Sequence, residues 1–160
     1  MLTELGVKRG DRVGVFSEPS LETAISVYGI MSAGAVFVPL DSNAPPARIA
    51  YVINDCGIKH IISAAKQSRS LNKVLEENVA REGMIGIGEK LPIKMVSWDE
   101  IERMSPHKAV SVRMLEDDLA YIMYTSGTTE RPKESCIRIA ADWLMPNFPW
   151  IYMMSDRPIF

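Results

Sequence analysis

The sequence predicts an α/β fold in which a parallel β-sheet is flanked by helices. Apolar strand segments alternate with helical segments along the 160 residues, and this order is typical of a parallel sheet covered by helices. The strand segments are continuous apolar runs, as expected for strands that are buried on both faces. A chain of this length buries roughly 70% of its extended surface on folding, which is enough for one core.

The first half of the chain predicts three strands and two helices. Residues 12–17 form an apolar run after a turn and predict the first strand. The helix that follows begins at Ser20 and ends at Gly34, and apolar residues occupy nearly all of its sides, which is typical of a buried helix. The same reasoning predicts the remaining elements of this half, with strands at 35–40 and 58–64 and a helix at 47–56.

The second half is less regular. Apolar spacing predicts a helix at 69–82, a weak strand at 93–97, a short helix at 98–104 and a strong strand at 118–124 that ends in a polar loop. Residues 83–90 are interpreted as a glycine-rich turn. Because their spacing is G-x-x-G-x-G, they are not a dinucleotide-binding fingerprint.

Composition and charge exclude several classes of protein. Apolar residues make up 47% of the chain and charged residues 24%, which fits a globular protein and excludes wholesale disorder. The net charge of −2 gives no reason to expect a nucleic-acid partner. No apolar stretch reaches the roughly 18 residues of a membrane span. Two cysteines cannot form a disulfide framework, so a cytoplasmic location is the simplest expectation.

The isolated polar residues predict structural roles. His60 lies within an apolar strand segment, where a structural histidine is expected rather than a ligand. Cys56 is expected to be a small core residue, and Asp41 and Asp55 are expected to be turn or capping residues. No group of histidines and cysteines has metal-ligand spacing, so no metal site is predicted.

The segment YTSGTTERPK at residues 124–133 follows a strong strand directly, where α/β sheets carry their ligand-binding loops. Hydroxyl and backbone N–H groups can surround an anion, glycine lets the backbone approach closely, and lysine adds positive charge. Pro132 and Glu134 exclude a Walker loop, and an ordinary polar turn is the alternative. The residues of the predicted triphosphate cradle are Thr125, Ser126, Gly127, Thr128, Thr129 and Lys133.

These residues resemble the AMP-forming acyl-activating (adenylate-forming) ligases. The cradle sequence is similar to the loop that marks this superfamily, which contains acyl-CoA synthetases, nonribosomal-peptide adenylation domains and luciferases. Upstream segments are similar in content and order to the N-terminal region of the same superfamily, and they are LGVKRGDRV at 5–13, AGAVFVPLD at 33–41, Arg48-Ile49 and Asp55-Cys56-Gly57. The resemblance covers residues 4–133 and identifies the chain as an N-terminal fragment of such a ligase.

The resemblance implies a two-step reaction. A carboxylate attacks the α-phosphate of ATP and gives an acyl-adenylate and pyrophosphate, and a thiol of coenzyme A or a carrier protein then takes the acyl group. The six cradle residues would bind the β- and γ-phosphates of ATP, and Mg²⁺ would accompany the nucleotide. A carboxylic acid and one of these thiols are therefore the expected partners.

Two glutamates depart from the loop of the family. Glu130 and Glu134 stand where the family usually has glycine. Glu130 adds a side chain and a negative charge close to the expected phosphates. A reduced affinity for ATP is therefore expected.

The chain beyond Lys133 does not resemble the family. Residues 134–160 contain no glycine and are rich in aromatic residues, and a short helix at 136–145 is the element expected there. A frameshift would explain this divergent tail, and a genuine divergent end is the alternative. The expected organisation is a partial AMP-binding N-terminal domain at 4–133 followed by the tail at 134–160.

The family's motifs downstream of the loop have no counterpart in the chain, so a complete catalytic set and complete turnover by this chain alone are not expected. One alternative is a non-catalytic remnant or interaction module that keeps only the fold. Another is an unrelated phosphate-binding α/β domain. Because a sheet cut out of a larger domain has uncovered edges and faces, self-association is also expected.

Overall fold

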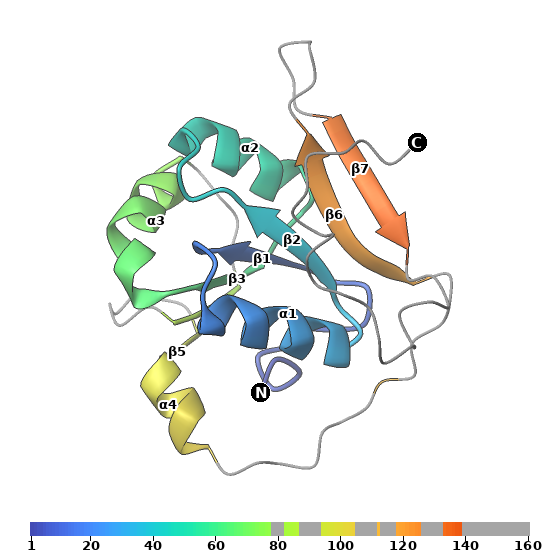
Figure 1. The fold of residues 1–160 in the computed structure, drawn as a ribbon, viewed down its shortest axis with the longest axis vertical. Coiled ribbons are helices and arrows are strands. Elements are labelled where there is room, and N and C mark those ends of the chain that lie inside the picture. The colour runs from blue at the N-terminus through green and yellow to red at the C-terminus, as the bar shows by residue number, and fades with distance from the viewer. Residues whose placement is uncertain (78–81, 87–93, 105–111, 113–117, 126–132, 139–160) are drawn as a thin grey trace.

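The computed structural model describes residues 1–77, 82–86, 94–104, 112, 118–125 and 133–138. Within these residues the chain forms one seven-stranded sheet in the order β5-β4-β3-β1-β2-β6-β7 (Figure 1). The strands are β1 (Arg12–Phe16), β2 (Val36–Leu40), β3 (His60–Ser63), β4 (Gly83–Ile85), β5 (Lys94–Val96), β6 (Leu119–Thr125) and β7 (Lys133–Arg138). Strands β1 to β6 pair in parallel, and β7 is antiparallel to β6. The parallel α/β fold predicted from the sequence is therefore confirmed.

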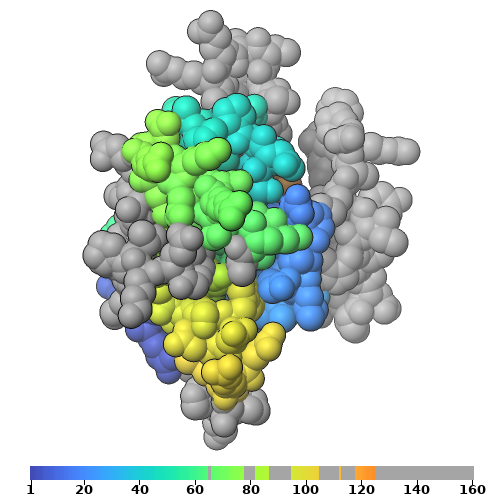
Figure 2. Space-filling view, turned by 90° about the vertical axis from the view of Figure 1, so that its left-hand side faces the viewer, coloured from blue at the N-terminus to red at the C-terminus, as the bar shows by residue number. Residues whose placement is uncertain are grey.

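Helices cover both faces of the sheet. The helices are α1 (Leu21–Ser32), α2 (Pro46–Asp55), α3 (Ser68–Leu75) and α4 (Trp98–Arg103), with a 3₁₀ turn η1 (Ala65–Gln67) before α3. Apolar side chains of α2 and α3 belong to one core cluster, and those of α1 and α4 belong to the other. Figure 2 shows α3 (green) beside α2 (cyan), with α4 (yellow) below them and α1 (blue) to one side.

The central strand β1 explains why the predicted strands are continuous apolar runs. Val13 and Val15 pack into the cluster of α1, whereas Phe16 packs into the cluster of α2 and α3. Gly14 lies between the two valines, and a Cβ on this glycine would come within 2.8 Å of Leu40 Cδ1. A side chain at position 14 would therefore force the end of the Leu40 side chain to move.

Helix α1 begins and ends as the sequence predicts. The Ser20 hydroxyl accepts a hydrogen bond from the Thr23 N–H at 3.3 Å, and Gly34 follows the helix with a φ of +70°. Apolar residues occupy most sides of the helix, but one face is exposed: Leu21 is 74% exposed and Ile25 is 48% exposed.

Three expected elements differ from the structure. Residues 83–85, interpreted as part of a glycine-rich turn, form β4, because their backbone pairs in parallel with β3 and β5. Residues 136–138, expected at the start of a short helix, belong to β7, where hydrogen bonding along β6 determines their conformation. The helix expected at 69–82 ends at Leu75. Residues 139–160 lie outside the described residues.

Candidate functional site

The predicted cradle begins and ends at one point on the sheet. Thr125 is the last residue of β6 and Lys133 the first of β7, and the two are register partners in the antiparallel pair. Because β6 is parallel to strands β1 to β5, Thr125 lies at the carboxyl edge of the parallel sheet, where α/β folds bind ligands. Ser126, Gly127, Thr128, Thr129 and Glu130 lie outside the described residues.

A side-chain contact holds the strand that precedes the cradle. The Tyr124 hydroxyl donates a hydrogen bond of 2.5 Å to Asp55 Oδ2, which lies at the C-terminal end of α2. Cys56 Sγ lies 3.3 Å from the same hydroxyl oxygen. Cys56 is buried in the core, as the sequence predicts. The sequence predicts a turn or capping role for Asp55. The structure adds a contact that this role does not include, because the Asp55 carboxylate accepts a hydrogen bond from a strand far along the chain.

The phenol of Tyr124 stays protonated at neutral pH. Burial raises the pKa of Tyr124 above its ordinary value, and the hydrogen bond to Asp55 raises it further. The hydroxyl group therefore remains a hydrogen-bond donor, and its 2.5 Å distance is typical of an O–H donor facing a carboxylate.

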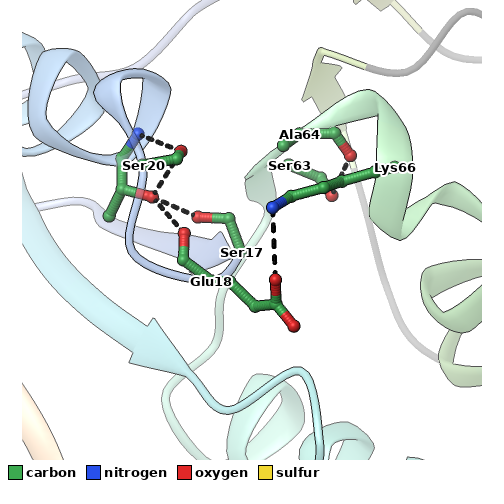
Figure 3. Close-up of polar contacts among 7 residues, drawn as sticks. Ser17, Glu18, Ser20, Ser63, Ala64 and Lys66 are labelled. Carbon is green, nitrogen blue, oxygen red and sulfur yellow. Dashed lines mark hydrogen bonds and ion pairs between the residues drawn. The ribbon is translucent and has the colours of Figure 1, made fainter.

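A second polar cluster lies at the carboxyl ends of β1 and β3 (Figure 3). Ser17 Oγ lies 2.7 Å from Thr23 Oγ1, and the Thr23 hydroxyl donates to the Glu18 carbonyl oxygen at 2.8 Å. Lys66 Nζ forms an ion pair of 3.1 Å with Glu18 Oε2. The hydroxyl groups serve the start of α1, and the charge of Lys66 is paired, so the cluster has a structural role.

This second cluster was not expected from the sequence. A signal was present, because two serines, a glutamate and a proline follow the first strand at residues 17–20. The sequence contained no such signal for Lys66, because its pairing with Glu18 depends on the adjacency of β1 and β3.

The single residues predicted to be structural agree with the structure. His60 is 4% exposed, and its Nε2 lies 3.2 Å from the Leu5 carbonyl oxygen. Asp41 Oδ1 accepts a hydrogen bond of 2.9 Å from the Asn43 N–H, which is a turn role. Among the described residues, no group of three or more His, Cys, Asp and Glu side chains could hold a metal ion.

Comparison with known proteins identifies the family. A family model described as AMP-binding enzyme matches residues 1–140. The chain belongs to the AMP-binding enzyme family.

Curated relatives of this AMP-binding chain are much longer proteins. The chain is 35% identical to surfactin synthase subunit 1 of Bacillus subtilis (strain 168) over 133 residues, which are 83% of this chain and 3% of that protein. It is 28% identical to zwittermicin A synthase ZmaJ of Bacillus cereus over 154 residues, which are 93% of this chain and 26% of that protein. The chain thus spans about a quarter or less of the length of these relatives.

Solved structures share the fold. The acyl-CoA synthetase of Brucella canis superimposes with a TM-score of 0.71 at 26% identity, covering 86% of this chain and 25% of that chain. An anthranilate CoA ligase, AuaEII, solved with anthranoyl-AMP, superimposes with a TM-score of 0.73 at 24% identity. That match covers 86% of this chain and 26% of the ligase chain. The described elements therefore match one part of larger ligase structures.

No helix within the described part of the chain is both long and apolar enough to cross a membrane.

Proposed function

We propose that this chain is part of an AMP-forming ligase that activates a carboxylic acid with ATP and passes the acyl group to a thiol. The observation that carries the proposal is the backbone pairing of Thr125 with Lys133 at the carboxyl edge of the sheet. This pairing brings the two ends of the cradle together where α/β folds bind ligands. Membership of the AMP-binding family supports the same reaction class.

The loop would hold the β- and γ-phosphates of ATP. Its hydroxyl-bearing residues, Thr125, Ser126, Thr128 and Thr129, can donate hydrogen bonds to phosphate oxygens, and Gly127 lets the backbone N–H groups approach. Lys133 supplies a compact positive charge. These groups stabilise the pyrophosphate that leaves when the carboxylate attacks the α-phosphate.

Mg²⁺ would enter this site with the nucleotide. The hydroxyl, amide and ammonium groups of the loop suit phosphate oxygens, and the described residues contain no metal-binding cluster of their own. Magnesium is commonly held by one or two carboxylates together with substrate phosphates. When bound, the ion offsets charge on the phosphates, and the loop residues orient them.

The acyl acceptor would be coenzyme A or the thiol of a carrier protein. Solved relatives include an acyl-CoA synthetase and a CoA ligase, and a surfactin synthase subunit is among the curated relatives. Both thiol classes therefore remain candidates for the second step. The low number of cysteines supports a reducing, cytoplasmic location for this chemistry.

We further propose that the 160-residue chain alone does not complete adenylation. It spans about a quarter of the solved ligase chains that it matches. A non-catalytic remnant that keeps the fold is the second candidate, and the glutamate at position 130 favours it. Family membership excludes the alternative of an unrelated phosphate-binding domain.

Calorimetric titration of the full chain with MgATP tests the proposal. We expect weak, saturable binding that is displaced by magnesium pyrophosphate and not by AMP, because the loop holds the β- and γ-phosphates. Displacement by AMP, or no binding at millimolar nucleotide, would refute a phosphate-binding role for the loop in this chain.

A further inference from the structure

Two segments that were singled out separately in the sequence meet in the structure. One is Asp55-Cys56-Gly57 at the end of α2, and the other begins with Tyr124 and continues into the predicted phosphate loop. The Tyr124 hydroxyl and the Asp55 carboxylate are 69 residues apart in the chain and form a hydrogen bond of 2.5 Å. Neither residue belongs to the predicted cradle itself.

The contact fixes the Tyr124 side chain at three points. Its ring packs against the core cluster of α2 and α3. Its hydroxyl donates to Asp55 Oδ2 and lies 3.3 Å from Cys56 Sγ, so the thiol can donate to the phenol oxygen in turn. Because Asp55 is exposed and Cys56 is buried, the contact spans the boundary between solvent and core.

Strand β6 lies beside β2, but its register pairing with the parallel sheet is short. Pairing between β2 and β6 is recorded at a single register position, Phe37 with Tyr121. Beyond Tyr121, β6 continues to Thr125 paired with the edge strand β7, with Tyr124 opposite Glu134 and Thr125 opposite Lys133. The Asp55 contact therefore ties the end of β6 to helix α2, beyond the register position that β6 shares with β2.

We propose that Asp55 and Tyr124 are positioning residues that hold the end of β6, from which the chain continues into residues 126–132, against helix α2. The consequence for phosphate binding rests on the proposed function. The contact itself does not, because it concerns the strand that enters the loop. Loss of the Tyr124 hydroxyl would free the end of β6 and the loop that follows it, while the core strands stay paired.

Amide hydrogen exchange of the full chain tests this role. The variants are Tyr124→Phe, which keeps the ring, Asp55→Ala, and Asp55→Asn, whose amide oxygen can still accept the hydrogen bond. Tyr121→Phe is the matched control, because Tyr121 lies on the same strand and packs into the opposite core cluster. Loss of one exposed hydrogen bond changes the equilibrium constant for local opening by roughly three- to tenfold.

We expect Tyr124→Phe and Asp55→Ala to accelerate exchange of the amides at 126–131 by roughly three- to tenfold. Asp55→Asn and Tyr121→Phe should leave loop exchange close to wild type, and exchange in β1 and β3 should not change in any variant. Equal loop exchange in wild type and Tyr124→Phe would overturn the proposal, as would wild-type loop amides that exchange at the unprotected rate. Acceleration spread over β1 and β3 would also overturn it, because it would show a loss of global stability.

Pyrophosphate titration of the same variants separates this proposal from the function. If wild type binds magnesium pyrophosphate, Tyr124→Phe should weaken binding by roughly three- to tenfold and Tyr121→Phe should not. If wild type does not bind, the proposed function fails, and the exchange experiment still decides whether Asp55 and Tyr124 position the loop.

Discussion

At the scale of single residues, the best-defined group near the predicted site is the Tyr124 phenol. Burial and the hydrogen bond to Asp55 raise its pKa above the ordinary value of a tyrosine. In the folded protein the Tyr124 hydroxyl therefore keeps a proton that it releases at about pH 10 in the unfolded chain. The stability that this group contributes is fully present below that pH and is lost as the pH rises above it.

This pKa shift predicts how the Tyr124→Phe variant compares with wild type. Urea unfolding should show wild type to be the more stable protein at about pH 8, because only wild type has the hydrogen bond to Asp55. The difference in unfolding free energy should shrink as the pH rises above about 10, because unfolded wild type then gains by releasing its proton. A difference that stays constant up to about pH 11 would contradict the raised pKa.

Replacement of Glu130 should raise the affinity of the chain for ATP. A carboxylate about 6 Å from a phosphate charge, at an effective dielectric constant of 20, costs roughly 3 kcal/mol before screening. We expect Glu130→Gly to strengthen MgATP binding by roughly tenfold or more in calorimetry at low salt. Glu134→Gly is the comparison variant, because residue 134 lies within β7. Equal affinity of wild type and Glu130→Gly would show that this charge does not reach the phosphates.

At the scale of elements, the central strands and the first two helices follow from local sequence, whereas the edges of the sheet do not. The apolar run that forms β1 is buried on both faces, and this burial is visible in its composition. Strands β4 and β7 lack such a run. Residues 83–85 and 133–138 become strands because a neighbouring strand offers them backbone partners, and that pairing is a long-range effect.

The candidate site divides in the same way. The end of the strand close to Thr125 could be predicted, because a polar segment directly follows a strong apolar run. The phosphate-binding role of the segment stays a prediction. The Asp55 contact could not be predicted, because it joins residues that are 69 positions apart. Single-sequence patterns report local periodicity and contain no information on which helix end reaches which strand.

Helix α1 offers a test at this scale. Its start depends on Ser20, whose hydroxyl accepts from the Thr23 N–H. We expect Ser20→Ala to lower the free energy of unfolding by about 1 kcal/mol, measured in urea, because one N–H group of the first turn loses its partner. The control is Ser70→Ala within α3, where an exposed serine should change stability by no more than about 0.5 kcal/mol. Equal effects of the two substitutions would contradict the capping role.

At the scale of the whole molecule, the chain has the architecture of one part of a larger ligase. A sheet of six parallel strands with helices on both faces superimposes on acyl-CoA synthetases, of which it covers about a quarter. Acyl activation requires the acid, the triphosphate and the acceptor to be held together, because positioning supplies much of the rate. The described elements of this chain include the two ends of the proposed phosphate loop, Thr125 and Lys133.

Because the chain corresponds to only one part of larger ligases, we expect a negative result in an activity assay. In ATP–pyrophosphate exchange with a mixture of carboxylic acids, the 160-residue chain should give no exchange above background, since the loop alone does not position an acid against the α-phosphate. Incorporation of label above a no-protein blank would contradict the proposed incompleteness of the chain. A full-length acyl-CoA synthetase assayed in parallel shows that the conditions support exchange.

Replacement of Lys133 tests most directly the proposal that the loop between β6 and β7 binds the phosphates of ATP. Lys66 provides a matched control, because this exposed lysine lies at the same edge of the sheet and is paired with Glu18. We expect Lys133→Ala to weaken binding of magnesium pyrophosphate by about tenfold or more in calorimetry, and Lys66→Ala to leave it unchanged. Equal binding by wild type and Lys133→Ala, or equal weakening by the two lysine variants, would contradict the claim.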